Sequence, residues 1–316
     1  MKIFLYVLIL QLIITNIYSQ WSGINPPEGI IVNAIAVSDS NIFIGTINNG
    51  ILRSSDSGNN WLQTTLINQK IISLVSLGNK LFAKTEKGIY VTKDEGRSFS
   101  FLKINNLFFE CLTALDGNVL GASDDLHYFD DEIPLRTEII TKFYLSGDSA
   151  KTWKVTSMFK ENFFTPQQIF PVKFLTFRNI VFASTSTGIY LSEDIGKNWN
   201  QIFPIYTTLI TTDGTNIYAV VKQDFIKSSN MGGNWSRTFF MISKVNTLIS
   251  IENNILIGCD SGIYISKDGG VSWTQKNEGM KNTIINYLYV MNNNIIAVDK
   301  ENYIWSRPFK EFLSIQ

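Results

Sequence analysis

Short runs of apolar residues alternate with polar turns along most of the chain. Runs of the form Gly-Ile-Tyr-aliphatic occur at 88–91, 188–191 and 262–265, and an apolar run that usually opens with Asn precedes each, as at 254–257. β-Branched and aromatic residues dominate these runs, whereas Asn and Gly separate them, which is typical of short antiparallel strands. Helical periodicity is absent over any useful length. The pattern predicts a repeating unit of four short strands.

A turn motif follows the third strand of most units and has the form Ser/Thr-x-Asp-x-Gly-x-x-Trp. Its carboxylate can accept hydrogen bonds from backbone N–H groups that a tight turn leaves unpaired, and its Gly permits a positive φ. Three copies deviate, because Phe99 replaces the Trp of the second, Ala150 replaces the Gly of the third and Asn230 replaces the Asp of the fifth. We assign a structural role to the acidic or amide residue of all six copies: Asp56, Asp94, Asp148, Asp194, Asn230 and Asp268.

The unit recurs about every 40 residues, as the blades of a β-propeller do. Six units carry the turn motif, and a seventh unit without it runs from 287 to 306. The seventh lacks an outer strand of its own, and residues 21–25 resemble the outer strand of the sixth unit at 273–277. The sequence therefore predicts an all-β fold, in which residues 20–316 form a single seven-bladed β-propeller of four-stranded antiparallel blades. We expect the N-terminal strand to close the ring; the alternative is a disordered N-terminal segment.

These repeats resemble those of the Asp-box (BNR) proteins, which include sialidases, xyloglucan-cleaving hydrolases and photosystem II assembly factor-like proteins. The resemblance covers residues 20–316, and the uniform blades are most similar to those of the photosystem II assembly factor-like group. It implies a sialidase-like propeller whose Asp-box turns lie on the rim opposite the usual ligand face. The motif specifies a fold much more narrowly than it specifies a function.

Residues 1–19 have the layout of a secretory signal peptide. Lys2 precedes an apolar run that starts at Ile3, and the small residue Ser19 stands before Gln20. The run is too short to span a bilayer comfortably, although an uncleaved anchor is the alternative. We therefore expect a secreted, periplasmic or cell-envelope protein with no membrane insertion after cleavage. The formal net charge of zero disfavours nucleic acid as a partner.

The titratable residues give little support for catalysis. The resemblance to sialidases implies a site with three converging arginines, yet only Arg136 is expected on the face opposite the motif turns. His127 is the only histidine, which disfavours a zinc cluster or a Ser-His-Asp triad. We interpret the densest carboxylate group, within 124–132, as a solvated acidic loop. We predict no catalytic residues, no metal site and no cofactor; the alternative is a glycoside hydrolase with a non-standard active site.

Two segments interrupt the repeat, at 124–141 within the third unit and at 156–172 between the third and fourth units. The resemblance places both on the face opposite the motif turns, where function often collects in loop expansions. Aromatic residues beside charges are typical of protein-binding surfaces, although the same residues could pack the insertions onto the ring. We predict a non-catalytic binding scaffold for an unknown protein or glycan. The candidate partner-binding residues are His127, Tyr128, Phe129, Arg136, Phe159, Phe163 and Phe164.

Overall fold

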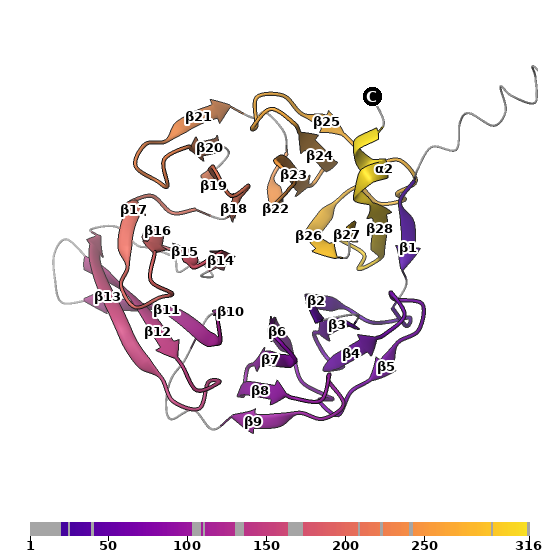
Figure 1. Ribbon diagram of the computed structural model, residues 1–316, viewed down its shortest axis with the longest axis horizontal. Helices are drawn as coiled ribbons and strands as arrows, with labels where there is room; N and C mark the ends of the chain where they lie inside the picture. Colours follow the sequence, from indigo (N-terminus) through magenta and orange to yellow (C-terminus); the bar gives the residue numbers. More distant parts are fainter. Residues whose placement is uncertain are drawn as a thin grey trace, which may run out of the picture.

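The computed structural model shows seven four-stranded antiparallel sheets arranged as the blades of a ring (Figure 1). It describes residues 20–24, 26–38, 41–102, 109, 111–129, 136–163, 173–207, 209–221, 224–239, 243–291 and 293–314. Blades 1 to 6 follow one another along the chain, and blade 7 combines the last strands with the first one. The seven-bladed propeller expected from the repeats is confirmed.

Each blade runs from an innermost strand beside the central axis to an outermost strand at the rim. The innermost strands are β2 (Val32–Ser38), β6 (Ile71–Leu77), β10 (Cys111–Leu115), β14 (Lys173–Phe177), β18 (Leu209–Thr212), β22 (Val245–Ile251) and β26 (Ile285–Met291). The second strands are β3 (Asn41–Thr46), β7 (Lys80–Thr85), β11 (Asn118–Phe129), β15 (Ile180–Thr185), β19 (Ile217–Val221), β23 (Asn254–Cys259) and β27 (Asn294–Asp299).

The third strands are β4 (Ile51–Ser54), β8 (Gly88–Thr92), β12 (Arg136–Ser146), β16 (Gly188–Ser192), β20 (Asp224–Ser228), β24 (Gly262–Ser266) and β28 (Ile304–Pro308). The outermost strands are β5 (Leu62–Gln63), β9 (Ser100–Leu102), β13 (Lys154–Phe163), β17 (Asn200–Phe203), β21 (Ser236–Phe239), β25 (Thr274–Gln275) and β1 (Ser22–Ile24). Each motif turn joins the third strand of its blade to the outermost strand. Because the third strands of all blades end on the same side of the ring, the six motif turns lie on one face, which we call the box face.

The core lies between neighbouring blades. Second strands such as β3 are buried along their whole length, which explains why they read as continuous apolar runs rather than as alternating ones. One cluster, for example, packs Phe43 and Ile51 of blade 1 against Ile71, Leu74 and Leu81 of blade 2. Because each interface needs two blades, the ring is stable only when every blade has both neighbours.

The N-terminal strand closes the ring, as predicted. β1 pairs with β28 in antiparallel register, with Ser22 opposite Ser306 and Ile24 opposite Ile304. Trp21 is buried between blades 6 and 7, where its indole Nε1 donates a hydrogen bond of 2.9 Å to the carbonyl oxygen of Lys276. The first strand of the chain therefore completes the sheet that contains the last one.

A short helix, α2 (Phe309–Ser314), follows β28 and was not expected from the sequence. Its Phe312 packs edge-to-face on Trp21 and also lies beneath the guanidinium group of Arg307. The Arg307 side chain is fully buried, and its Nη1 donates to the Glu278 carboxylate at 2.8 Å. The helix thus covers the seam at which the ring closes.

Candidate functional site

Blade 3 departs from the other blades because three of its strands continue past the point where the neighbours turn. In blades 2 and 4 a Thr–Gly pair ends the hairpin between the second and third strands, as Thr85 and Gly88 do. The equivalent pair in blade 3 is Ser123 and Lys142, and the strands run on from there to Phe129 and Arg136. The segments expected as loop expansions are therefore largely strand, up to the residues that the structure describes.

The outermost strand β13 extends in step with this hairpin, and its Phe163 lies opposite Thr137. Residues 125–129, 136–140 and 159–163 thus form a three-stranded antiparallel extension, which we call the wing (Figure 1, left). The two interruptions of the repeat come together in one sheet, as expected, at the end of blade 3 that lies away from its motif turn. The wing has two faces, since paired residues share a face and alternate along each strand.

One face of the wing turns toward blade 4 and is partly sealed by it. Phe159 packs between Phe143 and Tyr190, with ring centroids 6.2 and 4.6 Å away. The buried carboxylate of Asp124 accepts hydrogen bonds from the Thr141 hydroxyl and from the backbone N–H of Ser186. This burial raises the pKa of Asp124. These contacts hold the base of the wing against its neighbour.

Farther out, the same face becomes open. Tyr128, Thr137 and Phe163 form one row across the three strands, and Tyr128 is 54% exposed. On the opposite face, His127 is exposed and lies in a row with Glu138 and Asn162. An aromatic ring and a histidine are therefore presented to solvent on the two sides of one strand.

The tip of the wing holds a cation–π pair. The guanidinium carbon of Arg136 lies 3.9 Å from the centroid of the Phe129 ring, directly opposite in the register. Such a pair keeps a flat, partly apolar and positively charged surface in one conformation. Of the predicted residues, the wing thus brings His127, Tyr128, Phe129, Arg136 and Phe163 together.

Phe159 belongs to the packing at the base of the wing rather than to its open surface, and Phe164 lies outside the described residues. The sequence analysis missed Met158, which is 50% exposed and lies beside Lys142. The sequence shows no alternation of apolar and polar residues over 156–162, so only the pairing of β13 with β12 reveals this exposed position.

The described carboxylates of the wing are held by neighbours. Asp125 forms an ion pair with Lys142 at 2.5 Å, and Glu138 forms one with Lys160 at 3.8 Å. Glu161 accepts a hydrogen bond of 2.8 Å from the Gln201 amide of blade 4. No two of them are arranged as a free acid/base pair across an open site, which a glycosidase needs.

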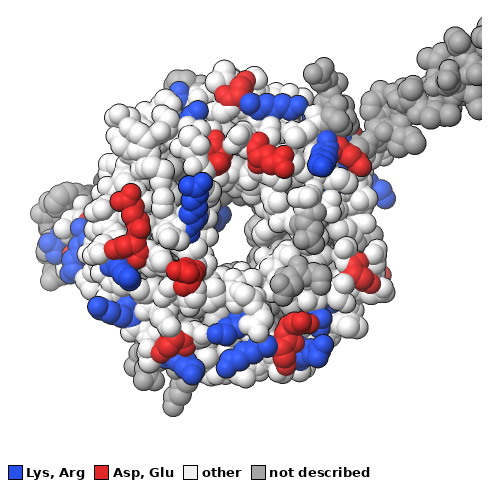
Figure 2. Space-filling model, in the orientation of Figure 1, with Lys and Arg blue, Asp and Glu red and all other residues white. Residues whose placement is uncertain are grey.

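The central opening of the ring is visible from end to end in Figure 2. Lys173 is the one charged residue on the described innermost strands, so these strands bring no carboxylate to the axis. No group of three or more His, Cys, Asp or Glu side chains in the described ranges is placed to hold a metal ion. Among the same residues, no helix has both the length and the apolar character that a membrane crossing requires.

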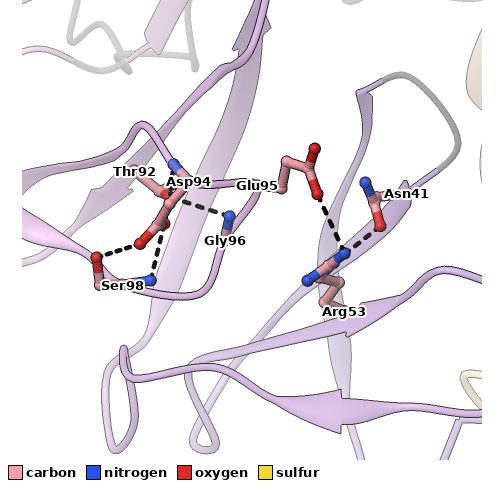
Figure 3. A network of polar contacts seen from close by, with 7 residues as sticks. All are labelled: Asn41, Arg53, Thr92, Asp94, Glu95, Gly96 and Ser98. Carbon is pink, nitrogen blue, oxygen red and sulfur yellow. Dashed lines mark hydrogen bonds and ion pairs between the residues drawn. The ribbon is translucent and has the colours of Figure 1, made fainter.

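Figure 3 shows how the carboxylate of a motif turn is used. One oxygen of Asp94 accepts hydrogen bonds from the Thr92 hydroxyl and the backbone N–H of Ser98, and the other accepts one from the Ser98 hydroxyl. The Thr92 hydroxyl in turn accepts a hydrogen bond from the backbone N–H of Gly96. The turns at Asp56, Asp148, Asp194 and Asp268 repeat this pattern, and Asn230 accepts the equivalent backbone bond from Asn234.

The third turn keeps its shape without a glycine. Ala150 has a φ of 66° and is fully buried, and its N–H donates to the Ser146 hydroxyl at 2.9 Å. The positive φ that the motif predicts is therefore required here too. The alanine carries the associated strain, which amounts to about 1 kcal/mol for a non-glycine residue in this region.

The depressed pKa values of the carboxyls in these turns predict that the protein loses stability in acid. The hydrogen bond from the Thr152 hydroxyl is the largest of several that lower the pKa of Asp148 to about 2. The Ser98 hydroxyl is the main cause that holds the pKa of Asp94 well below its usual range. A carboxyl whose pKa is depressed on folding stabilises the protein above its unfolded pKa. That contribution is lost as the pH falls through the folded pKa.

We therefore expect the melting temperature to fall steeply between about pH 4 and about pH 2. Asp148→Asn, which copies the natural Asn230, should flatten this fall while keeping the turn. Circular dichroism melts of both proteins across this range provide the measurement. An identical acid dependence of the two proteins would rule out a contribution from the Asp148 turn.

No protein-family model matches the sequence, and no curated protein sequence does so either. Solved structures match over nearly the whole chain. YCF48 from Cyanidioschyzon merolae is similar with a TM-score of 0.66 and 13% identity, over 93% of this chain and 99% of that one. YCF48 bound to D1 peptide gives 0.67 and 15%, over 92% and 97%.

A third similar structure is the extracellular domain of the putative one-component system BT4673 from B. thetaiotaomicron. It has a TM-score of 0.67 and 14% identity, over 92% of this chain and 40% of that one. At such identities the likeness establishes architecture alone. The chain is a seven-bladed β-propeller.

Proposed function

We propose that this protein is an exported, non-catalytic binding scaffold of the Asp-box class, and that its wing docks a protein partner. Residues 1–19 act as the signal peptide in this proposal, and the six motif turns stabilise the blades. The ring provides a rigid base, and specificity resides in the one blade that departs from the repeat.

The wing is the observation that carries the proposal. It is a hydrogen-bonded three-stranded sheet beyond the ring, and it presents His127 and the Phe129–Arg136 pair on one face and Tyr128 on the other. Tyrosine and arginine are the residue types that dominate binding energy at protein interfaces. A rigid surface also loses little conformational entropy on binding, which favours affinity.

Binding is favoured over glycoside hydrolysis by the placement of the carboxylates. The described acids of the wing are engaged with Lys142, Lys160 and Gln201, and the motif-turn acids cap backbone N–H groups. Lys173 is the one charged residue that the described innermost strands place beside the central axis. One of the matched propellers holds a bound peptide, which supports a peptide or protein as the partner.

A photo-crosslinking amino acid at position 128 is expected to trap a partner in cells that make the protein. The side chain there is 54% exposed at the open part of the wing. The same amino acid at Val271, which is 74% exposed in a motif turn on the box face, is the matched control. A discrete adduct at 128 that is absent at 271 supports the proposal.

The trapped partner then allows an affinity measurement with purified proteins. Tyr128→Ser combined with His127→Ser should weaken its binding by about tenfold or more, because truncation of an aromatic anchor costs about 2 kcal/mol. Equal adducts at 128 and 271, or unchanged affinity in the double variant, would contradict docking at the wing. A trapped glycan in place of a protein would redirect the proposal to a lectin-like function.

A further inference from the structure

The box face carries a polar cleft between the motif turns of blades 2 and 3. Its volume is about 430 Å³, which falls within the range of small-molecule sites. Blade 2 contributes the start of β7, the end of β8 and the outer strand β9, and blade 3 contributes the turn after β12. The lining residues are Lys80, Val91, Lys93, Asp94, Ser98, Ser100, Leu102, Asp148, Ser149 and Lys151.

Three lysines give this cleft its charge. The Nζ of Lys80 donates a hydrogen bond of 2.6 Å to the Ser149 hydroxyl and so links the two blades across the cleft. Lys93 and Lys151 are exposed, and their ammonium groups have no acidic partner in the described part of the chain. The two carboxylates in the lining, Asp94 and Asp148, are already occupied by their own turns.

Comparison with the other blades shows that this positive charge is not found in every groove between neighbouring blades. Lys80 opens the second strand of its blade, whereas the equivalent position is Ile180 in blade 4 and Asn in the other five blades. These are Asn41, Asn118, Asn216, Asn254 and Asn294.

The groove between blades 1 and 2 has Arg97 at the position equivalent to Lys151, and its second cation, Arg53, is neutralised. Arg53 donates to Asn41 at 2.8 Å and forms an ion pair with Glu95 at 3.5 Å (Figure 3). In the groove between blades 5 and 6, the positions of Lys80, Lys93 and Lys151 are taken by Asn216, Ser229 and Val271. That groove also contains Asp213. Only the groove between blades 2 and 3, among those described, gathers three lysines around hydroxyl groups.

We propose that the cleft between blades 2 and 3 binds a saccharide that carries a phosphate or sulfate group. The ammonium groups of Lys93 and Lys151 are free to approach the anionic oxygens, for which lysine acts as a mobile point charge. The hydroxyls of Ser98, Ser100 and Ser149 offer hydrogen bonds to sugar hydroxyls, and Val91 and Leu102 offer apolar contact. Figure 2 shows basic side chains gathered over the blade formed by β6–β9 on the viewed face.

This site is independent of the wing, which lies at the opposite end of blade 3. Binding of a soluble anion in the cleft therefore does not require the protein partner of the wing. An experiment can contradict one of the two proposals and leave the other unaffected. Because the attraction is electrostatic and partly exposed, binding should weaken as ionic strength rises.

Calorimetric titration of the full chain with glucose 6-phosphate, inorganic phosphate, inorganic sulfate and glucose tests the proposal. We expect glucose 6-phosphate to bind more tightly than either inorganic anion, and glucose to give no saturable signal. The variant Lys80→Asn/Lys93→Ser/Lys151→Val copies the groove between blades 5 and 6, and it should bind glucose 6-phosphate at least about tenfold more weakly, as expected for loss of the charge-assisted contacts.

The matched control is Lys87→Asn/Lys154→Ser/Lys244→Val, which removes the same charge from exposed positions outside the cleft. It should bind glucose 6-phosphate as the wild type does. Melting temperatures of both variants verify that the ring is intact. Equal weakening in the two variants, no saturable binding of any anion, or equal affinity for phosphate and glucose 6-phosphate would overturn the proposal.

Discussion

Removal of residues 20–26 is expected to lower the melting temperature by roughly 10 °C or more. The deletion removes β1, whose backbone pairs with β28, and exposes the edge of blade 7. It also removes Trp21, which is 4% exposed and packs on Phe312. Loss of a buried tryptophan alone costs about 3 kcal/mol or more.

Thermal melts of the fragment 20–316 with and without these residues provide the measurement. The point variant Trp21→Ala separates the two contributions, because it keeps the strand and loses the indole. It should fall between the wild type and the deletion. A deletion variant that melts with the wild type would show that the ring does not depend on the N-terminal strand for closure.

Glu278→Gln is expected to destabilise the protein by about 2 kcal/mol, although the change preserves shape. Arg307 has no exposed side-chain surface, and Glu278 is its acidic partner at 2.8 Å in the described structure. Burial is the main cause that lowers the pKa of Lys276 nearby, and the charge of Arg307 lowers it further. Without the Glu278 carboxylate, the repulsion between the charges of Arg307 and Lys276 would be less well offset.

The double variant Glu278→Gln/Arg307→Met is the control for this prediction. It removes the buried charge together with its partner, so it should be more stable than Glu278→Gln alone. Chemical denaturation of the three proteins gives the free energies of unfolding. If the double variant is the less stable one, the pair contributes through packing rather than through charge.

The architecture could be predicted because each blade repeats the same local sequence features. The motif around Asp94 determines a turn, the run at 88–91 determines a buried strand, and Trp21 resembles Trp273 closely enough to reveal the closing strand. Such features depend on neighbours in the sequence or on the repeat. By contrast, α2 spans six residues, which is too short for a helical period to be recognised.

The candidate site could be predicted only in part, because burial depends on other blades. The sequence located the wing but treated its strands as loops, since Lys142 stands at the position where Gly88 ends the hairpin of blade 2. Phe159 was grouped with the exposed aromatics, and only its contact with Tyr190 in blade 4 shows that it packs. The cleft lysines come from the start of β7 and from two motif turns, and they meet only in the folded ring.

The pairing of the first strand with the last has a consequence for biosynthesis. Ser22 donates its hydroxyl hydrogen bond to Ser306, which is 284 residues away in the chain. While the nascent polypeptide emerges, β1 has no partner, and its apolar residues remain available for wrong contacts until translation is nearly complete. We expect such a chain to benefit from a chaperone that holds it during synthesis, and a product truncated before β28 lacks the strand with which β1 pairs.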